Sequence, residues 1–209
     1  MTPTVVLASR NKGKIKELAV LLQPFGVTVE GLDAFPAVGE IEETGATFAE
    51  NSLLKAATVS KLTGHIAVAD DSGLVVDALG GEPGVYSARY SEEPGRPATD
   101  ERNTEKVLEK TRDVPDGSRT VRFVSVMAAA APDGRHILAE GRWEGILARK
   151  PSGTNGFGYD PVFFDPETGQ TAAQMEPAQK NARSHRAKAC QKLLELWPAF
   201  WKKTGGQTA

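Results

Sequence analysis

Apolar residues follow two different spacings along the first part of the chain. Residues 4–8 form a continuous apolar run rich in β-branched side chains, which is typical of a strand covered on both faces. After a polar turn, apolar residues recur at helical spacing, as Leu18 and Leu22 do, until a proline at position 24 ends the pattern. Residues 27–32 are the next predicted strand. The order strand, turn, helix, strand is the repeating unit of an α/β sheet.

Residues 47–64 carry a strong local helix signal. Thr47-Phe-Ala-Glu50 has the spacing of a capping box, in which the threonine and glutamate side chains satisfy the first free amides of a helix. The predicted helix runs to about Leu62 and stops at Gly64, because glycine adopts the left-handed conformation that ends helices. Asn51 and Lys55 are four residues apart and therefore share one face.

The pattern of the second half predicts a long antiparallel pair. Residues 119–131 and 135–149 flank Pro132-Asp-Gly134, which is a hairpin signal. Residues 80–96 are rich in glycine and proline and are predicted to be loop. Other predicted elements are a strand over 66–69, a helix over 99–111, a short strand over 161–164, a helix over 181–203 and a frayed tail over 204–209.

Length and composition narrow the class of protein. A chain of 209 residues fits one domain, 1–209, for which the hairpin predicts a separate lobe with the active cleft at the junction. A net charge of −2 argues against nucleic acid as a partner. The single cysteine, Cys190, allows no intrachain disulfide, and the three histidines match no zinc spacing. No segment has the pattern of a signal peptide or membrane span, so we expect a cytoplasmic protein without a membrane partner.

The turn after the first strand is a candidate anion site. Ser9-Arg-Asn-Lys-Gly-Lys14 places a lysine and backbone amides at a helix N-terminus, where anions bind. The turn is not a Walker A loop, because Ala8 and Ile15 stand where that motif requires glycine and a hydroxyl residue. A solvated turn would have the same composition.

Adjacent carboxylates follow the strand over 66–69. Asp70 and Asp71 would be costly to bury unless they are paired, hydrogen-bonded or bound to a cation. Mg²⁺ prefers oxygen ligands and usually bridges carboxylates to phosphate oxygens. The upstream acidic residues 40–43 could supply another ligand. A capping or turn role for the pair, and solvation of the upstream acids, are the plainer alternatives.

Two later segments could hold a flat ligand. Gly153-Thr-Asn-Gly-Phe-Gly-Tyr-Asp160 combines glycines, which allow close backbone approach, with a ring that could stack. Lys180 and Ser184-His-Arg186 add donors near the start of the last predicted helix. A flexible loop and surface residues are the alternatives for each segment alone. Together, the four segments supply phosphate donors, a carboxylate pair, an aromatic and a donor-rich clamp, as expected of a nucleotide hydrolase.

Six segments, in this order, resemble motifs of the inosine/xanthosine triphosphate pyrophosphatase family, the Ham1-like dITP/XTP pyrophosphatases. The resemblance runs collinearly from about residue 4 to residue 200, and no functional motif departs from the family pattern. The segments are Ser9-Arg-Asn-Lys-Gly-Lys14, Glu42-Glu-Thr-Gly45, Asp70-Asp-Ser-Gly73, Pro83-Gly-Val-Tyr-Ser-Ala-Arg89, Gly156-Phe-Gly-Tyr-Asp160 and Ser184-His-Arg186.

This resemblance implies an elongated mixed sheet with flanking helices, forming two lobes around a deep nucleotide cleft. It also implies a homodimer and dependence on Mg²⁺. The implied reaction is hydrolysis of ITP, dITP and XTP to the monophosphate and pyrophosphate. Such an activity removes deaminated purine nucleotides from the pool and prevents their incorporation into DNA and RNA.

The resemblance also implies roles for individual residues. Asp71 would be the general base, and Glu43 and Asp71 would bind the metal. The residues expected to contact the nucleotide, mostly at its phosphates, are Ser9, Arg10, Asn11, Lys12, Gly13, Lys14, Lys55, Ser72 and Lys180. The residues expected at the base and sugar are Phe157, Gly158, Tyr159, Asp160, His185 and Arg186.

Three other functions share some of these features. They are a pyrophosphatase acting on pyrimidine or modified nucleotides, a nucleotide sensor that binds without turnover, and a nucleic-acid-binding protein. The acidic pair argues against a sensor, because a pure binder gains little from a metal-bound base. Binding of nucleic acid would collapse with salt, whereas binding of a nucleotide in a pocket would respond less.

Overall fold

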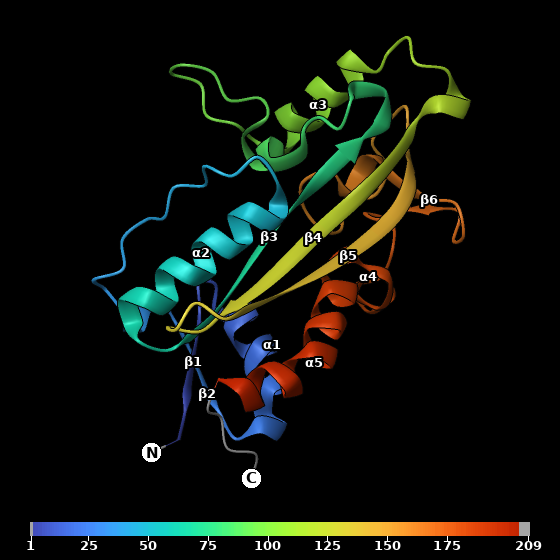
Figure 1. Cartoon of the computed structure of the whole chain (residues 1–209). Coiled ribbons are helices and arrows are strands. Elements are labelled where there is room, and N and C mark those ends of the chain that lie inside the picture. Colours follow the sequence, from blue (N-terminus) through green and yellow to red (C-terminus); the bar gives the residue numbers. More distant parts are fainter. Residues whose placement is uncertain (1, 205–209) are drawn as a thin grey trace. The chain divides into compact units, whose positions relative to one another are not determined.

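The computed structural model describes residues 2–204 and contains a mixed sheet with helices on its flanks (Figure 1). The strand order is β2-β1-β3-β4-β5-β6-β7. β1 is parallel to β2 and β3, and β6 is antiparallel to β5 and β7. The predicted α/β class is therefore confirmed. The strands are β1 (Thr4–Leu7), β2 (Thr28–Gly31), β3 (Ile66–Val76), β4 (Thr120–Ala130), β5 (His136–Leu147), β6 (Phe163–Asp165) and β7 (Gln170–Thr171).

The helices begin and end largely where local signals predict. α2 starts after Thr47 with both bonds of the capping box, and it ends at Gly64, whose φ is 71°. Thr99 caps α3 by accepting a hydrogen bond from the Arg102 amide. None of these helices, within residues 2–204, is both long enough and apolar enough to cross a membrane. The helices are α1 (Lys12–Leu22), α2 (Phe48–Thr63), α3 (Asp100–Lys110), α4 (Pro177–Arg183) and α5 (His185–Lys203).

Several predicted boundaries are wrong. β3 does not end at Ala69 but continues through both aspartates to Val76. A strand can contain these carboxylates because they are only partly buried and have polar partners in the fold. The helix predicted over 181–203 is two helices separated by Ser184, whose hydroxyl accepts a hydrogen bond from the Ala187 amide and so starts a new helix. The predicted loop over 80–96 contains a 3₁₀ helix, Gly84–Arg89. Of the predicted tail, all but residue 204 lies outside the described residues.

The described chain forms two compact units. Unit 1 comprises residues 2–71, 126–140 and 189–204, and unit 2 comprises residues 72–125 and 141–188. The boundaries fall within β3, β4, β5 and α5, so these four elements contribute to both units. Neither unit therefore contains the whole of the predicted hairpin.

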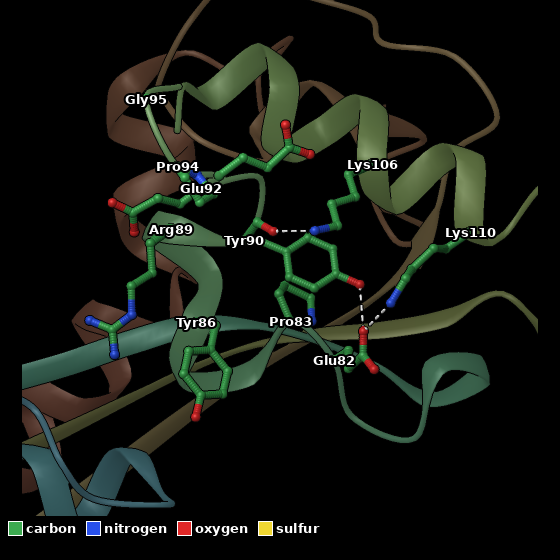
Figure 2. A pocket seen from close by; sticks show the side chains of 11 residues that line it. Glu82, Pro83, Tyr86, Arg89, Tyr90, Glu92, Pro94, Gly95, Lys106 and Lys110 are labelled. Carbon is green, nitrogen blue, oxygen red and sulfur yellow. Dashed lines mark hydrogen bonds and ion pairs between the residues drawn. The ribbon is translucent and has the colours of Figure 1, made fainter. Parts of the chain in front are cut away.

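Unit 2 contains a pocket of about 740 Å³ between the 3₁₀ helix Gly84–Arg89 and α3 (Figure 2). Tyr90 lies at its centre, with the ammonium groups of Lys106 and Lys110 at 4.8 and 5.3 Å from the ring centroid. The Tyr90 hydroxyl donates to Glu82 Oε2 at 2.6 Å, and burial raises the pKa of Tyr90. The residues that line this pocket include none of the predicted site residues.

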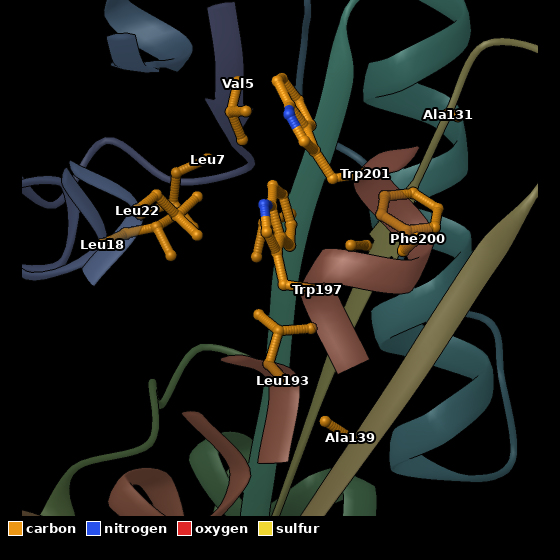
Figure 3. Packing of buried hydrophobic residues seen from close by; sticks show 12 residues of the cluster. Val5, Leu7, Leu18, Leu22, Ala131, Ala139, Leu193, Trp197, Phe200 and Trp201 are labelled. Atoms are coloured by element: carbon orange, nitrogen blue, oxygen red, sulfur yellow. The ribbon is translucent and has the colours of Figure 1, made fainter. Parts of the chain in front are cut away.

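Unit 1 has cores on both faces of its strands. On one face, Leu22 of α1 and Trp197 of α5 pack with Val5 and neighbouring strand residues (Figure 3). On the other face, Ala56 and Val59 of α2 pack with small strand residues. These two helical layers fix the strand ends that carry the predicted phosphate and metal residues. In the same unit, burial raises the pKa of the single thiol, Cys190, to about 11, so it stays protonated at neutral pH.

Candidate active site

The turn that leads into α1 is held by its own side chains. Asn11 caps the helix, and its Oδ1 accepts hydrogen bonds from the Gly13 and Lys14 amides at 2.9 and 3.2 Å. Ser9 Oγ accepts from the Asn11 amide at 3.1 Å. Because these amides already have partners, an anion at this turn would depend chiefly on side chains. Lys12 is exposed and therefore accessible to such an anion.

Arg10 contacts the segment that follows β2. Its guanidinium donates to Asp33 Oδ1 and to the carbonyls of Leu32 and Val38, at 3.3 to 3.4 Å. The Arg10 side chain therefore braces the segment after β2, although the sequence predicts it as a nucleotide contact. The positive charge remains exposed and can still act on a nearby anion through space.

Side chains of β3 alternate between the two faces of the sheet. Val68 packs in the cluster with α1 and α5, whereas Ala67 and Ala69 pack with α2. Continuing this alternation puts Asp70 on the α1 face and Asp71 on the α2 face. The two neighbouring carboxylates are thereby separated by the sheet, which reduces their mutual repulsion.

Asp70 is paired with the predicted phosphate-binding lysine. Lys14 Nζ donates to Asp70 Oδ1 at 3.0 Å and to Oδ2 at 2.7 Å. An ammonium group has three donors, so Lys14 retains one donor for a ligand while the pair stays intact. The pair is also partly exposed, with 32% of the lysine side chain and 17% of the aspartate side chain accessible.

On the α2 face, Lys55 connects two predicted functional segments. Its Nζ donates to Glu43 Oε1 and, at 2.7 Å, to the backbone carbonyl of Asp70. This carbonyl is available because β1 ends at Leu7, whereas β3 continues past that point. Lys55 therefore holds the Glu43 carboxylate beside the part of β3 that carries Asp71.

The carboxylate oxygens on this face are suitable ligands for a magnesium ion. Glu43 and Asp71 offer carboxylate oxygens, and Mg²⁺ is commonly held by one or two carboxylates together with substrate phosphates and water. Among residues 2–204, no group of three or more histidine, cysteine, aspartate or glutamate side chains forms a metal cage. A site of two carboxylates completed by a phosphate ligand is compatible with that arrangement.

In unit 2, Asp160 organises the glycine-rich loop. Its buried carboxylate accepts a hydrogen bond from the Phe157 amide at 2.8 Å and forms an ion pair with Lys180. Gly156 must be glycine here, because its φ is 78° and a Cβ atom would lie 2.0 Å from Asp160 Oδ2. The Gly158 amide donates to Asp100 Oδ2 at 2.6 Å. These bonds fix the loop conformation from inside the unit.

The fixed loop presents an aromatic ring to solvent. Phe157 is 60% exposed, so its ring is accessible to a ligand although the backbone that carries it is fixed. Lys180 Nζ and Arg186 Cζ lie 4.9 and 5.2 Å from its ring centroid. Lys180, expected mostly at the phosphates, is thus a neighbour of the ring in this unit. An exposed ring with two cations beside it suits a flat, polar ligand.

Tyr159 belongs to the core. Its side chain is 5% exposed, its hydroxyl donates to the Ser87 carbonyl at 2.8 Å, and burial raises its pKa. The phenol therefore anchors the loop to the segment at Ser87, whereas the sequence predicts Tyr159 at the base or sugar. Nothing in the local pattern signals Ser87 as the partner of Tyr159 or Asp100 as the partner of Gly158, because these partners lie 72 and 58 residues away in the sequence.

The remaining predicted residues, His185 and Arg186, begin α5, and Arg186 contacts Ser72. His185 is buried and stacks on Phe123 with centroids 4.8 Å apart and an interplanar angle of 17°. Arg186 donates from Nη2 to Ser72 Oγ at 3.2 Å. The buried Arg186 Nε has no hydrogen-bond partner among the described residues. Unit 2 thus gathers Ser72, Phe157, Lys180 and Arg186 around a surface rich in donors.

A family model, curated relatives and solved structures resemble this chain. The Ham1 family model matches residues 5–196. A protein named dITP/XTP pyrophosphatase from Nitratidesulfovibrio vulgaris is 61% identical over 202 residues, covering 95% of this chain and 98% of the relative. A protein of the same name from Desulforamulus reducens is 50% identical over 192 residues, covering 92% and 94%. The solved structure of a HAM1 protein from Coxiella burnetii has a TM-score of 0.87 at 40% identity, covering 95% of this chain and 100% of that one. The chain therefore belongs to the Ham1 family, as its six motifs predict.

Proposed function

We propose that this chain is a Mg²⁺-dependent pyrophosphatase that hydrolyses ITP, dITP and XTP to the monophosphate and pyrophosphate. Relatives that align along almost the whole chain carry the name dITP/XTP pyrophosphatase. The structural observation that carries the proposal is the arrangement on β3. Strand alternation puts Asp71 on the α2 face, where Lys55 holds Glu43, and Asp70 is paired with Lys14 on the other face.

The residues of unit 1 suit the phosphates. Lys14 and Lys55 each have a donor beyond those used within the protein, and both pairs are partly exposed. When bound, Mg²⁺ supplies charge neutralisation on the phosphate oxygens. Glu43 and Asp71 are the residues that would hold it. The turn Ser9–Lys14 adds positive charge from Lys12 for the same part of the substrate.

Asp71 would act as the general base. Hydrolysis between the α and β phosphates requires a water molecule to lose a proton as its oxygen attacks the α-phosphorus. A carboxylate positioned near that water accepts the proton. Pyrophosphate leaves with the electron pair of the broken P–O bond, and the ammonium groups of Lys14 and Lys55 stabilise its charge.

The residues of unit 2 suit a purine with an oxygen at position 6. Arg186 has only donors, and a keto oxygen accepts from them, whereas the amino group of adenine presents another donor. Phe157 would stack on any purine, adding affinity without choosing among bases. Lys180 adds a second cation beside the Phe157 ring, and His185 precedes Arg186 at the start of α5. ITP is therefore expected to be preferred over ATP, while discrimination against GTP rests on the family resemblance alone.

The biological role proposed with this activity is removal of deaminated purine nucleotides before polymerases use them. We further propose a homodimer in the cytoplasm, to which the segment 80–89 would contribute. Tyr86 in that segment is 57% exposed, with Arg89 over its ring. Light scattering at micromolar concentration tests the dimer, and a monomer would refute it.

Product analysis tests the reaction itself. Incubation of the protein with ITP and Mg²⁺ is expected to yield IMP and pyrophosphate in equal amounts. Orthophosphate with IDP would indicate cleavage at the γ position and contradict the proposal. Binding of ITP without turnover would identify a sensor, and turnover confined to pyrimidine triphosphates would identify a pyrophosphatase of a different specificity.

A further inference from the structure

Asn51 lies one helical turn before Lys55 on the same face of α2. Its side chain is fully buried, and its Oδ1 accepts a hydrogen bond from the Gly45 amide at 2.7 Å. Because that partner is a donor, the amide orientation of Asn51 is fixed. Its Nδ2 is buried without a hydrogen-bond partner among the described residues.

The segment that carries Glu43 is fastened to α2 at three points. Glu50 Oε2 accepts from the Ala46 and Thr47 amides at 2.7 and 3.2 Å, which completes the cap of the helix. Lys55 holds the Glu43 carboxylate. The Asn51 bond lies between these two points, and it is the one that fixes the backbone closest to Glu43.

Gly45 allows this contact by its size. A Cβ atom at position 45 would lie 2.7 Å from Asn51 Oδ1, 2.7 Å from Glu50 Cβ and 3.0 Å from the Asn51 amide. Two of these atoms belong to Asn51, and one is the backbone amide of a buried helical turn, which cannot move easily. Glycine at position 45 and asparagine at position 51 are therefore complementary.

We propose that Asn51 is a positioning residue for magnesium binding. Through Gly45 it fixes the backbone two residues after Glu43, so that this carboxylate is held toward the face of β3 that carries Asp71. Lys55 alone would hold only the end of a flexible glutamate side chain. The inference rests on the proposed function, because it takes Glu43 as a ligand of Mg²⁺.

Two substitutions and a matched control test this role. Asn51→Ala removes the side-chain oxygen of α2 that accepts the hydrogen bond. Gly45→Ala places a Cβ atom against Asn51 and so disrupts the same bond from the segment that carries Glu43. Ser60→Ala is the control, because Ser60 is a buried residue of the same helix whose hydroxyl donates to the His65 carbonyl at 2.7 Å, away from Glu43. Hydrogen–deuterium exchange of residues 43–47 in the metal-free protein reports the positioning. The Mg²⁺ concentration that gives half-maximal pyrophosphate release at saturating ITP reports its consequence.

We expect Asn51→Ala and Gly45→Ala to accelerate exchange over residues 43–47. We also expect them to raise the half-saturating Mg²⁺ concentration by about 10- to 100-fold, the usual effect of losing a partner that orients a metal ligand. Turnover at saturating Mg²⁺ should be retained. The double variant should resemble either single variant, because both break the same interaction. Ser60→Ala should alter neither readout.

Unchanged exchange in Asn51→Ala would overturn the inference, as would faster exchange with an unchanged requirement for Mg²⁺. If Asn51→Ala does not fold, Gly45→Ala decides the matter by the same two readouts. Absence of pyrophosphate release from the wild-type protein would refute the proposed function. An active wild-type protein whose Asn51 variant needs no additional Mg²⁺ would refute this inference alone.

Discussion

Two ion pairs of unit 1, Lys14–Asp70 and Lys55–Glu43, differ in accessibility from two ion pairs of unit 2, Lys180–Asp160 and Arg183–Asp165. In unit 1, the carboxylates of Asp70 and Glu43 are 17% and 27% exposed and each contacts a lysine. In unit 2, the carboxylates of Asp160 and Asp165 are 4% and 2% exposed. The unit 2 carboxylates also accept hydrogen bonds from other donors of the fold.

This difference separates two uses of the same chemistry. A partly exposed pair can share its cation with an incoming phosphate, because its donors and oxygens reach solvent. A buried pair with several hydrogen bonds cannot open without leaving a charge uncompensated, which is strongly destabilising. Accessibility therefore suggests that the unit 1 pairs act on ligands, whereas the unit 2 pairs fasten α4 to the glycine-rich loop and to β6.

The largest effect is expected at the residue proposed as the base. Asp71→Asn keeps the shape of the side chain but removes its charge and most of its basicity. Turnover of ITP should fall by at least about 100-fold, the usual scale for losing a general base, while substrate binding survives in part. Steady-state kinetics with Mg²⁺ measure this. A near-normal rate would remove Asp71 from the mechanism.

A smaller effect is expected at the accessible pair of unit 1. Lys14→Ala removes a charged donor, and hydrogen bonds to charged groups contribute about 1.5–3 kcal/mol, or about 10- to 100-fold in affinity. The KM for ITP should rise more than the inhibition constant of IMP, because only the triphosphate has β and γ phosphates. The exposed Lys16 of α1 provides a control through Lys16→Ala. An equal loss of affinity for ITP and for IMP would assign Lys14 to another role.

A more selective effect is expected at the donor surface of unit 2. Arg186→Ala should lower kcat/KM for ITP by about 10-fold or more, since an unpaired polar group costs about 1–3 kcal/mol. The residual turnover of ATP should fall far less, so the ratio of the two kcat/KM values should narrow. Parallel assays with both nucleotides test this. If both values decrease by the same factor, Arg186 is a general anchor and does not recognise the keto group.

The smallest effect on activity is expected at the buried pair of Asp165, which should affect stability instead. Burial alone would raise the pKa of Asp165, but hydrogen bonds from Arg183, the Glu167 amide and Trp143 lower it below its ordinary value. The charged form therefore stabilises the fold above the unfolded pKa of about 4, and this contribution is lost as the pH falls through the lowered folded value.

Urea unfolding of Asp165→Asn measures this contribution. The variant should be less stable than the wild type at neutral pH, and the difference should shrink below about pH 4. Asp33→Asn is the control, because Asp33 forms an exposed pair with Arg10 that is expected to contribute little. A difference in unfolding free energy that does not change with pH would show that the charge of Asp165 is not the stabilising feature.

Local signals predict the elements of unit 1 well. The capping box at Thr47 and the stop at Gly64 define α2 within the sequence itself, because both depend on neighbouring residues. The course of β3 could not be predicted in the same way. Asp70 is stabilised within a strand by Lys14, 56 residues earlier, and no local pattern contains that partner.

The site in unit 2 shows the same limit. The motif Gly156-Phe-Gly-Tyr-Asp160 indicates a ligand loop, but the sequence does not distinguish the exposed Phe157 from the buried Tyr159. The Tyr159 hydroxyl donates to the distant Ser87 carbonyl, and the neighbouring Gly158 amide donates to the also distant Asp100. The sequence pattern also does not predict the break between α4 and α5, because a single capping serine interrupts an otherwise continuous helical pattern.

This Ham1 family chain is proposed to cleave deaminated purine nucleotides and to select them by the base. Rates of pyrophosphate release from ITP, XTP, dITP, GTP, ATP and dUTP, measured with Mg²⁺ and again in excess EDTA, test this proposal most directly. We predict that kcat/KM for ITP, dITP and XTP exceeds that for ATP by at least about 100-fold, because several mismatched donors act together. All activity should disappear in EDTA and return with Mg²⁺. Comparable values for ITP and ATP, or turnover that persists in the chelator, would contradict the account.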